Sequence, residues 1–487
     1  MKKYIFYVVA LMTICTIGCR KIEMDGEPII IEVPGGNDGG TNPVGKSVTL
    51  KGHVTKDTTL YAKDKNIISG FVYVDAGVTL TVEKGATVKG DYASSEASTL
   101  IIKRGAKIMA AGTQEAPIVF TSSSPTPQSG DWGGIVLLGK ASINAKNGGA
   151  PALYIPEGGF NNAAGDGLAG WGDAVAPKAV DDDNSGVLQY VRIEYAGNAY
   201  LPNQEINSLT MAAVGSGTTI DHIQVSYAKD DAFEWFGGTV NCKYLIAYKT
   251  QDDDFDSDNG YSGSVQFGLI VRDSTIADVS KSESFESDND GDGSDLTPQT
   301  KAVFCNISSF GPLATPNNVG NANYLGPAVQ IRRNSSISIF NSAFVGWPVG
   351  ILIDATKGKH TDLNIAAGTL QLSGIILASC KTPLDYTEAG TSTYSLAALT
   401  TWFKGNAKNK ILTQNGVQDI YTRPFDYNSP DWIPFGNSAV VIPAASNNYF
   451  DDPILTARPF ITKVDFLGGI APSGPNAGWH KGWTKFN

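Results

Sequence analysis

The feature of this chain that most restricts its fold is a short theme repeated along most of its length. Runs of β-branched, aromatic and aliphatic residues alternate with turns of Gly, Asn and Asp, as in VRIEYAG (191–197), IQVSYAK (223–229) and YLIAYKT (244–250). Two Gly-Ala-x-[Val/Ile] units, which begin at Gly85 and Gly105, lie 20 residues apart. A period of about 20 to 35 residues, built from short strands without helical segments between them, indicates a solenoid.

The strands of this solenoid are expected to be parallel. A strand in a solenoid buries its inner face by stacking on the equivalent strand of the next coil, about 4.8 Å away. The runs are almost continuously apolar and β-branched, which is typical of parallel strands. A β-sandwich is the alternative, but it needs tight hairpins, and the Asn-Gly and Asp-Gly pairs fall mostly in acidic loops. With 17% charged residues and 54 Gly, neither disorder nor a coiled coil is favoured.

The N-terminus resembles a bacterial lipoprotein signal. Lys2 and Lys3 precede an apolar stretch, which ends in Thr16-Ile17-Gly18-Cys19. The resemblance implies cleavage before Cys19 and acylation of that residue, which makes Cys19 the predicted lipidation site. The alternative is an ordinary secretory signal with an accidental Cys, and both interpretations export the protein.

The sequence predicts four segments. The stretch after Cys19 is rich in Gly and Pro and lacks periodicity, so it is expected to act as a flexible tether with a reach of about 25 to 30 Å. From about residue 384 the period fades, and Trp and Pro become frequent, which suggests an irregular cap. The predicted boundaries are a signal peptide at 1–18, lipidated Cys and tether at 19–47, a parallel β-helix at 48–383, and C-terminal coils with a cap at 384–487.

Several motifs together resemble a large, mostly uncharacterised group of right-handed β-helix lipoproteins of Bacteroidetes-type bacteria. They are GAKIMAAGTQEAPIVFTS (105–122), WGGIVLLG (132–139), DNSGVLQYVRIEYAG (183–197), DDAFEWFGGTVN (230–241), DDDFDSDNGYSG (252–263), FESDNDGDG (285–293) and the ending GWHKGWTKF (478–486). The resemblance implies an all-β, right-handed parallel β-helix with loop insertions and a C-terminal cap. It also implies a lipid-anchored location in the outer membrane, facing the cell surface.

The charge of the chain is concentrated in one segment. Residues 229–295 hold 16 Asp and Glu against 5 Lys and Arg, a net charge of −11, which is nearly the whole net charge of −13 that remains once Lys2 and Lys3 of the signal are removed. No basic stripe exists that could neutralise phosphates, so nucleic acid is excluded as a partner.

Within this segment, FEWF, FDSD and FESD align on their first Phe, at residues 233, 255 and 285. The alignment predicts two columns of acids on successive coils: Glu234, Asp256 and Glu286 in the first, and Asp258 and Asp288 in the second. Like charges one coil apart repel unless they are protonated or bridged by a cation, and oxygen-rich sets of this kind suit Ca²⁺.

The run from Asp288 to Gly293 also has the D-x-D-x-D-G spacing of a calcium loop. The predicted calcium ligands are Asp254, Asp256, Asp258, Glu286, Asp288, Asp290 and Asp292. The alternative is that these acids form a solvated face that keeps coil edges from aggregating.

Two catalytic alternatives use the same region. Asp230 and Asp231 loosely resemble the paired Asp of polygalacturonase-like hydrolases, although the accompanying Gly-His-Gly is absent. Arg332 and Arg333 are candidate bases for a pectate-lyase-like reaction, in which Ca²⁺ neutralises a uronate carboxylate. No lyase signature surrounds either Arg, so catalysis is the minor hypothesis.

Aromatic residues interleave with the acids. Trp235, Tyr248 and Tyr261 are predicted to offer a platform for sugar rings, with an internal aromatic stack as the alternative. The leading hypothesis is a surface-tethered, Ca²⁺-stabilised β-helix that binds an extended polysaccharide or cell-envelope ligand without cleaving it. A calcium-dependent polysaccharide lyase or a glycoside hydrolase is the alternative. The expected partners are outer-membrane lipid, through acylated Cys19, and an outer-membrane transporter.

Overall fold

The computed structural model describes most of the chain: residues 29–33, 45–147, 150–160, 165–201, 204–279, 281–312, 326–390, 392–412, 417–424, 430–443 and 446–486. The predicted signal peptide, Cys19 and most of the predicted tether lie outside these residues.

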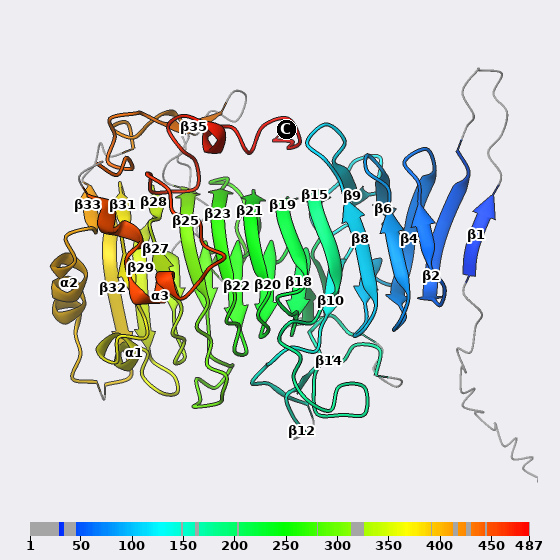
Figure 1. Cartoon of the computed structure of the whole chain (residues 1–487), viewed down its shortest axis with the longest axis horizontal. Coiled ribbons are helices and arrows are strands. Elements are labelled where there is room, and N and C mark those ends of the chain that lie inside the picture. The colour runs from blue at the N-terminus through cyan, green and yellow to red at the C-terminus, as the bar shows by residue number, and fades with distance from the viewer. Residues whose placement is uncertain are drawn as a thin grey trace, which may run out of the picture.

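The described strands confirm the parallel β-helix. A 27-stranded sheet winds along the long axis of the molecule, and every pairing in it is parallel except that of β1 with β2 (Figure 1). The coils present three faces. The first face consists of β7 (Thr99–Ile102), β10 (Gly134–Leu138), β18 (Leu209–Ala212), β20 (Phe233–Phe236), β22 (Phe255–Asp258), β24 (Phe285–Ser287), β26 (Pro327–Ile331), β29 (Val349–Ala355) and β32 (Thr382–Glu388).

The other two faces share five long strands that bend around a corner: β15 (Gly186–Glu194), β19 (Thr219–Ser226), β21 (Asn241–Tyr248), β23 (Ser264–Val271) and β25 (Val303–Phe310). Their first halves continue β3 (Thr58–Leu60), β5 (Thr79–Val82) and β8 (Lys107–Ala111), and are followed by β27 (Ser338–Phe340) and β30 (Leu372–Ser373). Their second halves continue β6 (Thr87–Gly90) and β9 (Ile118–Ser122), and are followed by β28 (Ala343–Val345), β31 (Ile376–Ala378) and β33 (Lys410–Leu412). At the N-terminal end, β2 (Ser47–Val54) and β4 (Lys65–Val74) run on from the third face to the first.

The corner of the long strands is made by residues with positive φ. Tyr190, His222, Tyr244 and Phe267 have φ between 49° and 66°, which turns the chain without breaking the pairing on either side. Their rings stack on one another from coil to coil, with centroids 4.3, 4.3 and 4.9 Å apart. The corner is therefore an aromatic column on the outside of the solenoid.

The two Gly-Ala units, although 20 residues apart, are not equivalent positions of successive coils. Val88, in the first Gly-Ala unit, pairs with Phe120, whereas Ile108, in the second unit, pairs with Leu80. The two units therefore lie on different faces and do not stack. Each Gly-Ala turn makes a corner, the first between β5 and β6 and the second between β7 and β8, so the motif marks two different corners and not successive coils.

The C-terminal part covers one end of the solenoid and then returns along its side. Helix α2 (Leu396–Gly405) begins at Ser395, whose side chain accepts a hydrogen bond from the amide of Ala398, and it buries Leu399 and Phe403 in the core. The following segment runs back over β25, β23, β21 and β19, where Trp479 and Trp483 pack against the aromatic column (Figure 1). It contains β34 (Tyr421–Arg423), β35 (Asp431–Pro434), α3 (Pro453–Thr456) and two short 3₁₀ turns, Asn447–Phe450 and Pro475–Ala477. Helix α1 (Asp362–Ala366) precedes this region.

The N-terminal half of the solenoid carries one extra antiparallel strand and three small strand pairs in its insertions. Residues 29–33, which the sequence assigns to the tether, form β1 (Ile29–Val33), whose β-branched residues pair antiparallel with β2. Three small hairpin strand pairs belong to insertions after β10 and β15: β11 (Lys146–Asn147) with β12 (Ala150–Pro151), β13 (Leu153–Tyr154) with β14 (Ala169–Gly170), and β16 (Asn198–Leu201) with β17 (Gln204–Ile206).

Alternation along the first face decides which side chains point outward. In β20, Phe233 and Trp235 belong to the interior cluster, so Glu234 and Phe236 point away from it. The next two strands keep this register, because Phe233 pairs with Phe255 and Phe255 pairs with Phe285. Acidic residues are thereby placed on the outer surface, where the insertions cover them.

Candidate functional site

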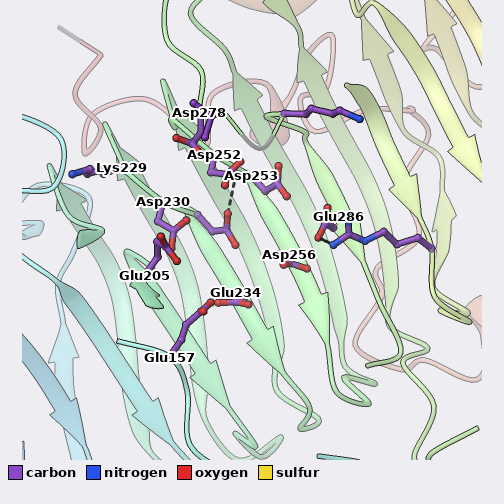
Figure 2. A pocket seen from close by; sticks show the side chains of 14 residues that line it. Glu157, Glu205, Lys229, Asp230, Glu234, Asp252, Asp253, Asp256, Asp278 and Glu286 are labelled. Carbon is purple, nitrogen blue, oxygen red and sulfur yellow. Dashed lines mark hydrogen bonds and ion pairs between the residues drawn. The ribbon is translucent and has the colours of Figure 1, made fainter. Parts of the chain in front are cut away.

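The acidic segment forms a cavity on the outside of the first face, which we name the acidic cavity. It has a volume of about 470 Å³, and its polar lining consists of ten carboxylic acids and three basic residues (Figure 2). The acids are Glu157, Glu205, Asp230, Asp231, Glu234, Asp252, Asp253, Asp256, Asp278 and Glu286, and the basic residues are Lys229, Lys281 and Arg332.

One column of the cavity follows the predicted register. Glu234 pairs with Asp256, and Asp256 pairs with Glu286, on β20, β22 and β24. Figure 2 shows the three carboxyl groups along neighbouring strands. The alignment on Phe therefore identifies this column correctly.

Another column of acids, which differs from the predicted column of Asp258 and Asp288, lies just before the same strands. It consists of Asp231, Asp253 and Glu283, and it was not predicted from the sequence. The Asp231 carboxylate accepts a hydrogen bond from the amide of Asp253 at 2.9 Å, and the Asp253 carboxylate accepts one from the amide of Glu283 at 2.6 Å. Each of these acids is 7% exposed or less. All three stand two residues before the aligned Phe, so the same alignment contained the signal.

The insertions form part of the wall of the cavity. Glu157, from the insertion after β10, and Glu205, from β17, point toward the columns (Figure 2). Asn207 also donates a hydrogen bond to Glu234 and accepts one from the amide of Asp231 at 3.1 Å. The insertions thus add further negative charge to a site that already holds two acidic columns.

Burial and mutual repulsion raise the pKa of several of these acids. Burial raises the pKa of Asp231, Glu234 and Asp256 well above the usual range, and neighbouring carboxylates raise it further. Burial also raises the pKa of Glu157 and of Glu286 to about 7, although Arg332 opposes the shift of Glu286. The cluster can be relieved in two ways, by protonation or by a bound cation.

Three overlapping groups of carboxylates have the geometry to hold a cation. In each group the ligand oxygens lie within 4.8 Å of one another. The groups are Asp230, Asp231 and Asp252; Asp231, Glu234 and Asp256; and Asp253, Asp256 and Glu286. Oxygen Oδ1 of Asp256 is buried and has no hydrogen-bond partner among the described residues. Hard carboxylate oxygens in an irregular arrangement match the coordination that Ca²⁺ accepts.

The structure corrects the role predicted for Asp254. Its side chain is fully buried, and Arg272, which is also fully buried, donates to its carboxylate at 2.8 Å. Asp254 does not line the acidic cavity. Since Asp254 follows the two acids that face outward, it turns into the interior, where it serves an internal ion pair.

The predicted calcium loop is also not built as expected. Asp288 is held by Arg332 and Arg333, at 2.8 and 2.5 Å. Asp290 accepts hydrogen bonds from the backbone and hydroxyl of Ser294 and from the amide of Asp292, so it stabilises its own turn. The Asp292 side chain is 90% exposed.

Of the predicted calcium ligands, Asp256 and Glu286 lie in the cation groups. Among the residues that the structure describes, those groups do not include Asp254, Asp258, Asp288, Asp290 or Asp292. Asp258, at the end of β22, lies near Asp288, and burial together with Asp288 raises its pKa. The D-x-D-x-D-G spacing does not form a calcium loop here, because the arginines bind Asp288, Asp290 stabilises its own turn, and Asp292 is exposed.

The candidate catalytic residues separate into two kinds. Asp230 and Asp231 line the acidic cavity, and burial, followed by neighbouring acids, raises the pKa of both. Arg332 contacts Glu286 and Asp288, and these two acids raise the pKa of its guanidinium despite burial. A base must be unprotonated, so Arg332 is poorly suited to remove a proton, and Arg333 is engaged by Asp288.

The predicted aromatic platform is wrong. Trp235, Tyr248 and Tyr261 are at most 1% exposed. Trp235 stacks on Tyr261 inside the solenoid at 5.3 Å, and the Tyr248 hydroxyl donates to the carbonyl of Phe486. These rings form packing contacts, as the alternative of an internal stack predicts for Trp235 and Tyr261.

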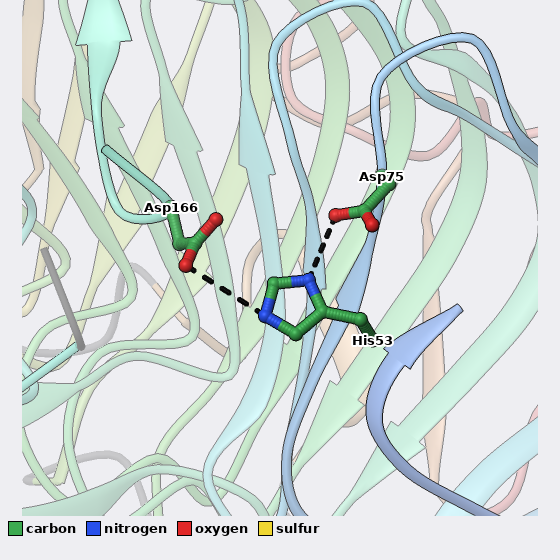
Figure 3. A group of neighbouring side chains, drawn as sticks. All are labelled: His53, Asp75 and Asp166. Atoms are coloured by element: carbon green, nitrogen blue, oxygen red, sulfur yellow. Dashed lines mark hydrogen bonds and ion pairs between the residues drawn. The ribbon is translucent and has the colours of Figure 1, made fainter. Parts of the chain in front are cut away.

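A smaller cluster lies near the N-terminal coils (Figure 3). His53 lies between Asp75, 2.9 Å from Nδ1, and Asp166, 3.7 Å from Nε2. Lys103 contacts both acids, at 2.8 and 2.5 Å. Because an ammonium already bridges the two carboxylates, this cluster is an ion-pair network that joins the insertion to the coils.

Comparison with known proteins agrees with the fold. No curated protein and no solved structure matches the chain. A sequence model of the pectate-lyase-like β-helix domain matches residues 52–419, which include the first complete coils, the acidic cavity and α2. Because this region is more than half of the chain and its strands form stacked parallel coils, the protein belongs to the pectate-lyase-like β-helix domain family.

Proposed function

We propose that this protein binds an extended polysaccharide in a Ca²⁺-dependent manner at the acidic cavity, without cleaving it. The observation that carries the proposal is the overlap of three carboxylate groups in one cavity, with Asp231 and Asp256 each belonging to two of them. A cation between these oxygens replaces their repulsion by attraction, and its free coordination positions accept hydroxyl or carboxylate oxygens of a sugar.

The shape of the molecule supports an extended ligand. The acidic cavity is lined from three successive coils, by acids around β20, β22 and β24. A surface that repeats at each coil offers equivalent contacts to a polymer with a repeating unit. The pectate-lyase-like family is compatible with polysaccharide as the ligand class.

Hydrolysis is the second candidate function. A general acid must hold a proton at working pH, and burial and neighbouring acids raise the pKa of Asp230 and of Asp231, which favours the protonated form. The lyase alternative has less support, since both candidate bases are held in ion pairs with acids.

We also propose that acylated Cys19 anchors the protein in the outer membrane, facing the cell surface, with an outer-membrane transporter as a partner. The lipobox-like Thr16-Ile17-Gly18-Cys19 supports this location. None of the helices in the described ranges has the length and apolar character needed to span a bilayer. Incorporation of labelled palmitate into the full chain, and its loss in Cys19→Ala, tests the anchor.

The binding proposal is tested by affinity electrophoresis of residues 20–487. Gels contain polygalacturonate, xylan, β-glucan or galactomannan, each with Ca²⁺ or with EDTA. We expect retardation in at least one polymer with Ca²⁺, loss of retardation in EDTA, and loss in Asp231→Asn combined with Asp256→Asn. Asp292→Asn removes one charge outside the cavity and should behave as wild type. Equal retardation in Ca²⁺ and EDTA would contradict the proposal, and sugar release from a retained polymer would favour hydrolysis.

A further inference from the structure

A second pocket lies beside the acidic cavity, and we name it the tyrosine pocket. It has a volume of about 710 Å³, and its lining includes Gln128, Ser129, Tyr195, Tyr227, Gln251 and Ala277. Two of the turns that line the tyrosine pocket also line the acidic cavity. In the first turn, Gln251 lines the tyrosine pocket and its neighbour Asp252 lines the acidic cavity. In the second turn, Ala277 lines the tyrosine pocket and Asp278 lines the acidic cavity. The two sites are therefore contiguous along the turns that lead into the first face.

The two tyrosines follow strands of adjacent coils. Tyr195 comes directly after β15 and Tyr227 directly after β19, both with positive φ, so the corner geometry directs them to equivalent positions. Their rings stack with centroids 5.0 Å apart and planes 6° from parallel. Both side chains are partly exposed, unlike the buried rings of Trp235 and Tyr261. They form an aromatic surface at the mouth of the pocket.

The lining of the tyrosine pocket is chemically distinct from that of the acidic cavity. None of the described residues that line it carries a charge, whereas thirteen charged residues line the acidic cavity. Phenol rings, the side-chain amides of Gln128 and Gln251, and the hydroxyls of Ser129 and Thr275 are the polar and aromatic groups present. Aromatic rings pack against the C–H faces of sugars, while amides and hydroxyls bond their OH groups, so this set suits uncharged pyranose rings.

The pocket is also long enough for a chain of sugars. It draws residues from the segments after β9, β15, β19, β21 and β23, which are five successive coils. Four steps of about 4.8 Å give a length of roughly 19 Å along the solenoid axis. A site of this length fits several linked rings better than a single monosaccharide.

We infer that the tyrosine pocket binds the uncharged pyranose rings of the polysaccharide whose neighbouring part engages the acidic cavity. This inference rests on the proposed function, and it adds the chemical class of the ligand and a second group of contact residues. Tyr195 and Tyr227 supply the ring contacts, and Gln128 and Gln251 supply the hydrogen bonds that orient the chain.

The test uses residues 20–487 with Ca²⁺ in affinity gels that contain xylan, β-glucan, galactomannan or polygalacturonate. Tyr195→Ala combined with Tyr227→Ala should weaken retention at least tenfold in the polymer that retains the wild type. Ser129→Trp fills the pocket without altering either tyrosine and should weaken retention similarly. Tyr61→Ala removes a tyrosine that is 42% exposed on the turn between β3 and β4, at another corner of the solenoid, and should have no effect.

The outcomes separate the two proposals. Retention that is lost in both pocket variants, with an unchanged melting temperature in Ca²⁺, supports the tyrosine pocket. Wild-type retention that persists in the folded Ser129→Trp variant overturns the tyrosine pocket and leaves the acidic cavity as the binding site. Absence of wild-type retention in every polymer overturns both the proposed function and this inference.

Discussion

Asp256→Asn is predicted to change stability in opposite directions with and without Ca²⁺. Asp256 is the acid shared by two of the three cation groups, and one of its oxygens is buried without a hydrogen-bond partner among the described residues. In the metal-free protein, removing the Asp256 charge relieves its repulsion with the neighbouring carboxylates, which stabilises the fold. In the calcium-bound protein, the same change removes a metal ligand, which reduces the stabilisation by calcium. No substitution that merely damages packing produces this reversal.

The magnitude follows from the distances between the carboxylates. Two unit charges 4.8 Å apart, the upper limit within each group, interact by about 3.5 kcal/mol at an effective dielectric constant of 20. Protonation limits the repulsion, so we expect Asp256→Asn to stabilise the metal-free protein at pH 8 by about 2 kcal/mol. At an unfolding entropy of about 2.1 cal/mol/K per residue, a chain of this length gains about 1 °C per kcal/mol, which gives about 2 °C.

Calcium should act in the other direction. An ion present at a hundredfold excess over its dissociation constant stabilises the wild type by about 2.7 kcal/mol, or about 3 °C per ion. The assay is differential scanning calorimetry of residues 20–487 at pH 8, in EDTA and in Ca²⁺, with Asp292→Asn as the matched control. A variant that melts below the wild type in EDTA, or that keeps the full calcium shift, would refute the reasoning.

Three further predictions concern stability. The pKa of Glu286 is raised to about 7 in the folded protein from 4.5 in the unfolded chain. The folded state therefore holds the Glu286 proton more tightly, and the stabilisation that this gives is fully present below about pH 4.5 and is lost as pH rises through about 7. The free energy of unfolding should fall by about 3 kcal/mol over this range. Thermal melts in EDTA should therefore fall between pH 5 and 8, and a flat profile would contradict the shift. Arg272→Met should cost about 3–5 kcal/mol in urea unfolding because it leaves Asp254 buried without its ion-pair partner, and Asp254→Leu in the same chain should recover most of the loss. Ser395→Ala should cost about 1 kcal/mol, since it removes the N-cap of α2, whereas Ser395→Asp should not.

The sequence predicts the fold well because the signal repeats. Alternation in FEWF, FDSD and FESD is enough to place Phe233 inside and Glu234 outside, and the same alignment gives the pairing of Glu234 with Asp256 and of Asp256 with Glu286. In the first coils the signal is a turn motif, and this motif recurs at different corners of the solenoid. It therefore cannot distinguish one corner of a coil from the next coil.

The details of the site depend on contacts that are distant in the chain. Nothing in the run from Asp288 to Asp292 shows that Arg332 and Arg333 occupy Asp288, because those arginines lie on the next coil. Glu157 and Glu205 reach the acidic cavity from insertions, whose paths follow no repeat. Tyr195 and Tyr227 could have been found, since VRIEYAG and IQVSYAK place Tyr at the same position of consecutive repeats.

The most direct test of calcium binding is a crystal structure of residues 20–487 grown with Ca²⁺, with anomalous diffraction data. We predict an anomalous peak in the acidic cavity, 2.3–2.6 Å from carboxylate oxygens of the groups that share Asp231 and Asp256. The same peak should disappear in crystals of Asp256→Asn. A well-ordered cavity without a peak at saturating Ca²⁺, or a peak only at the exposed Asp292 turn, would contradict the account.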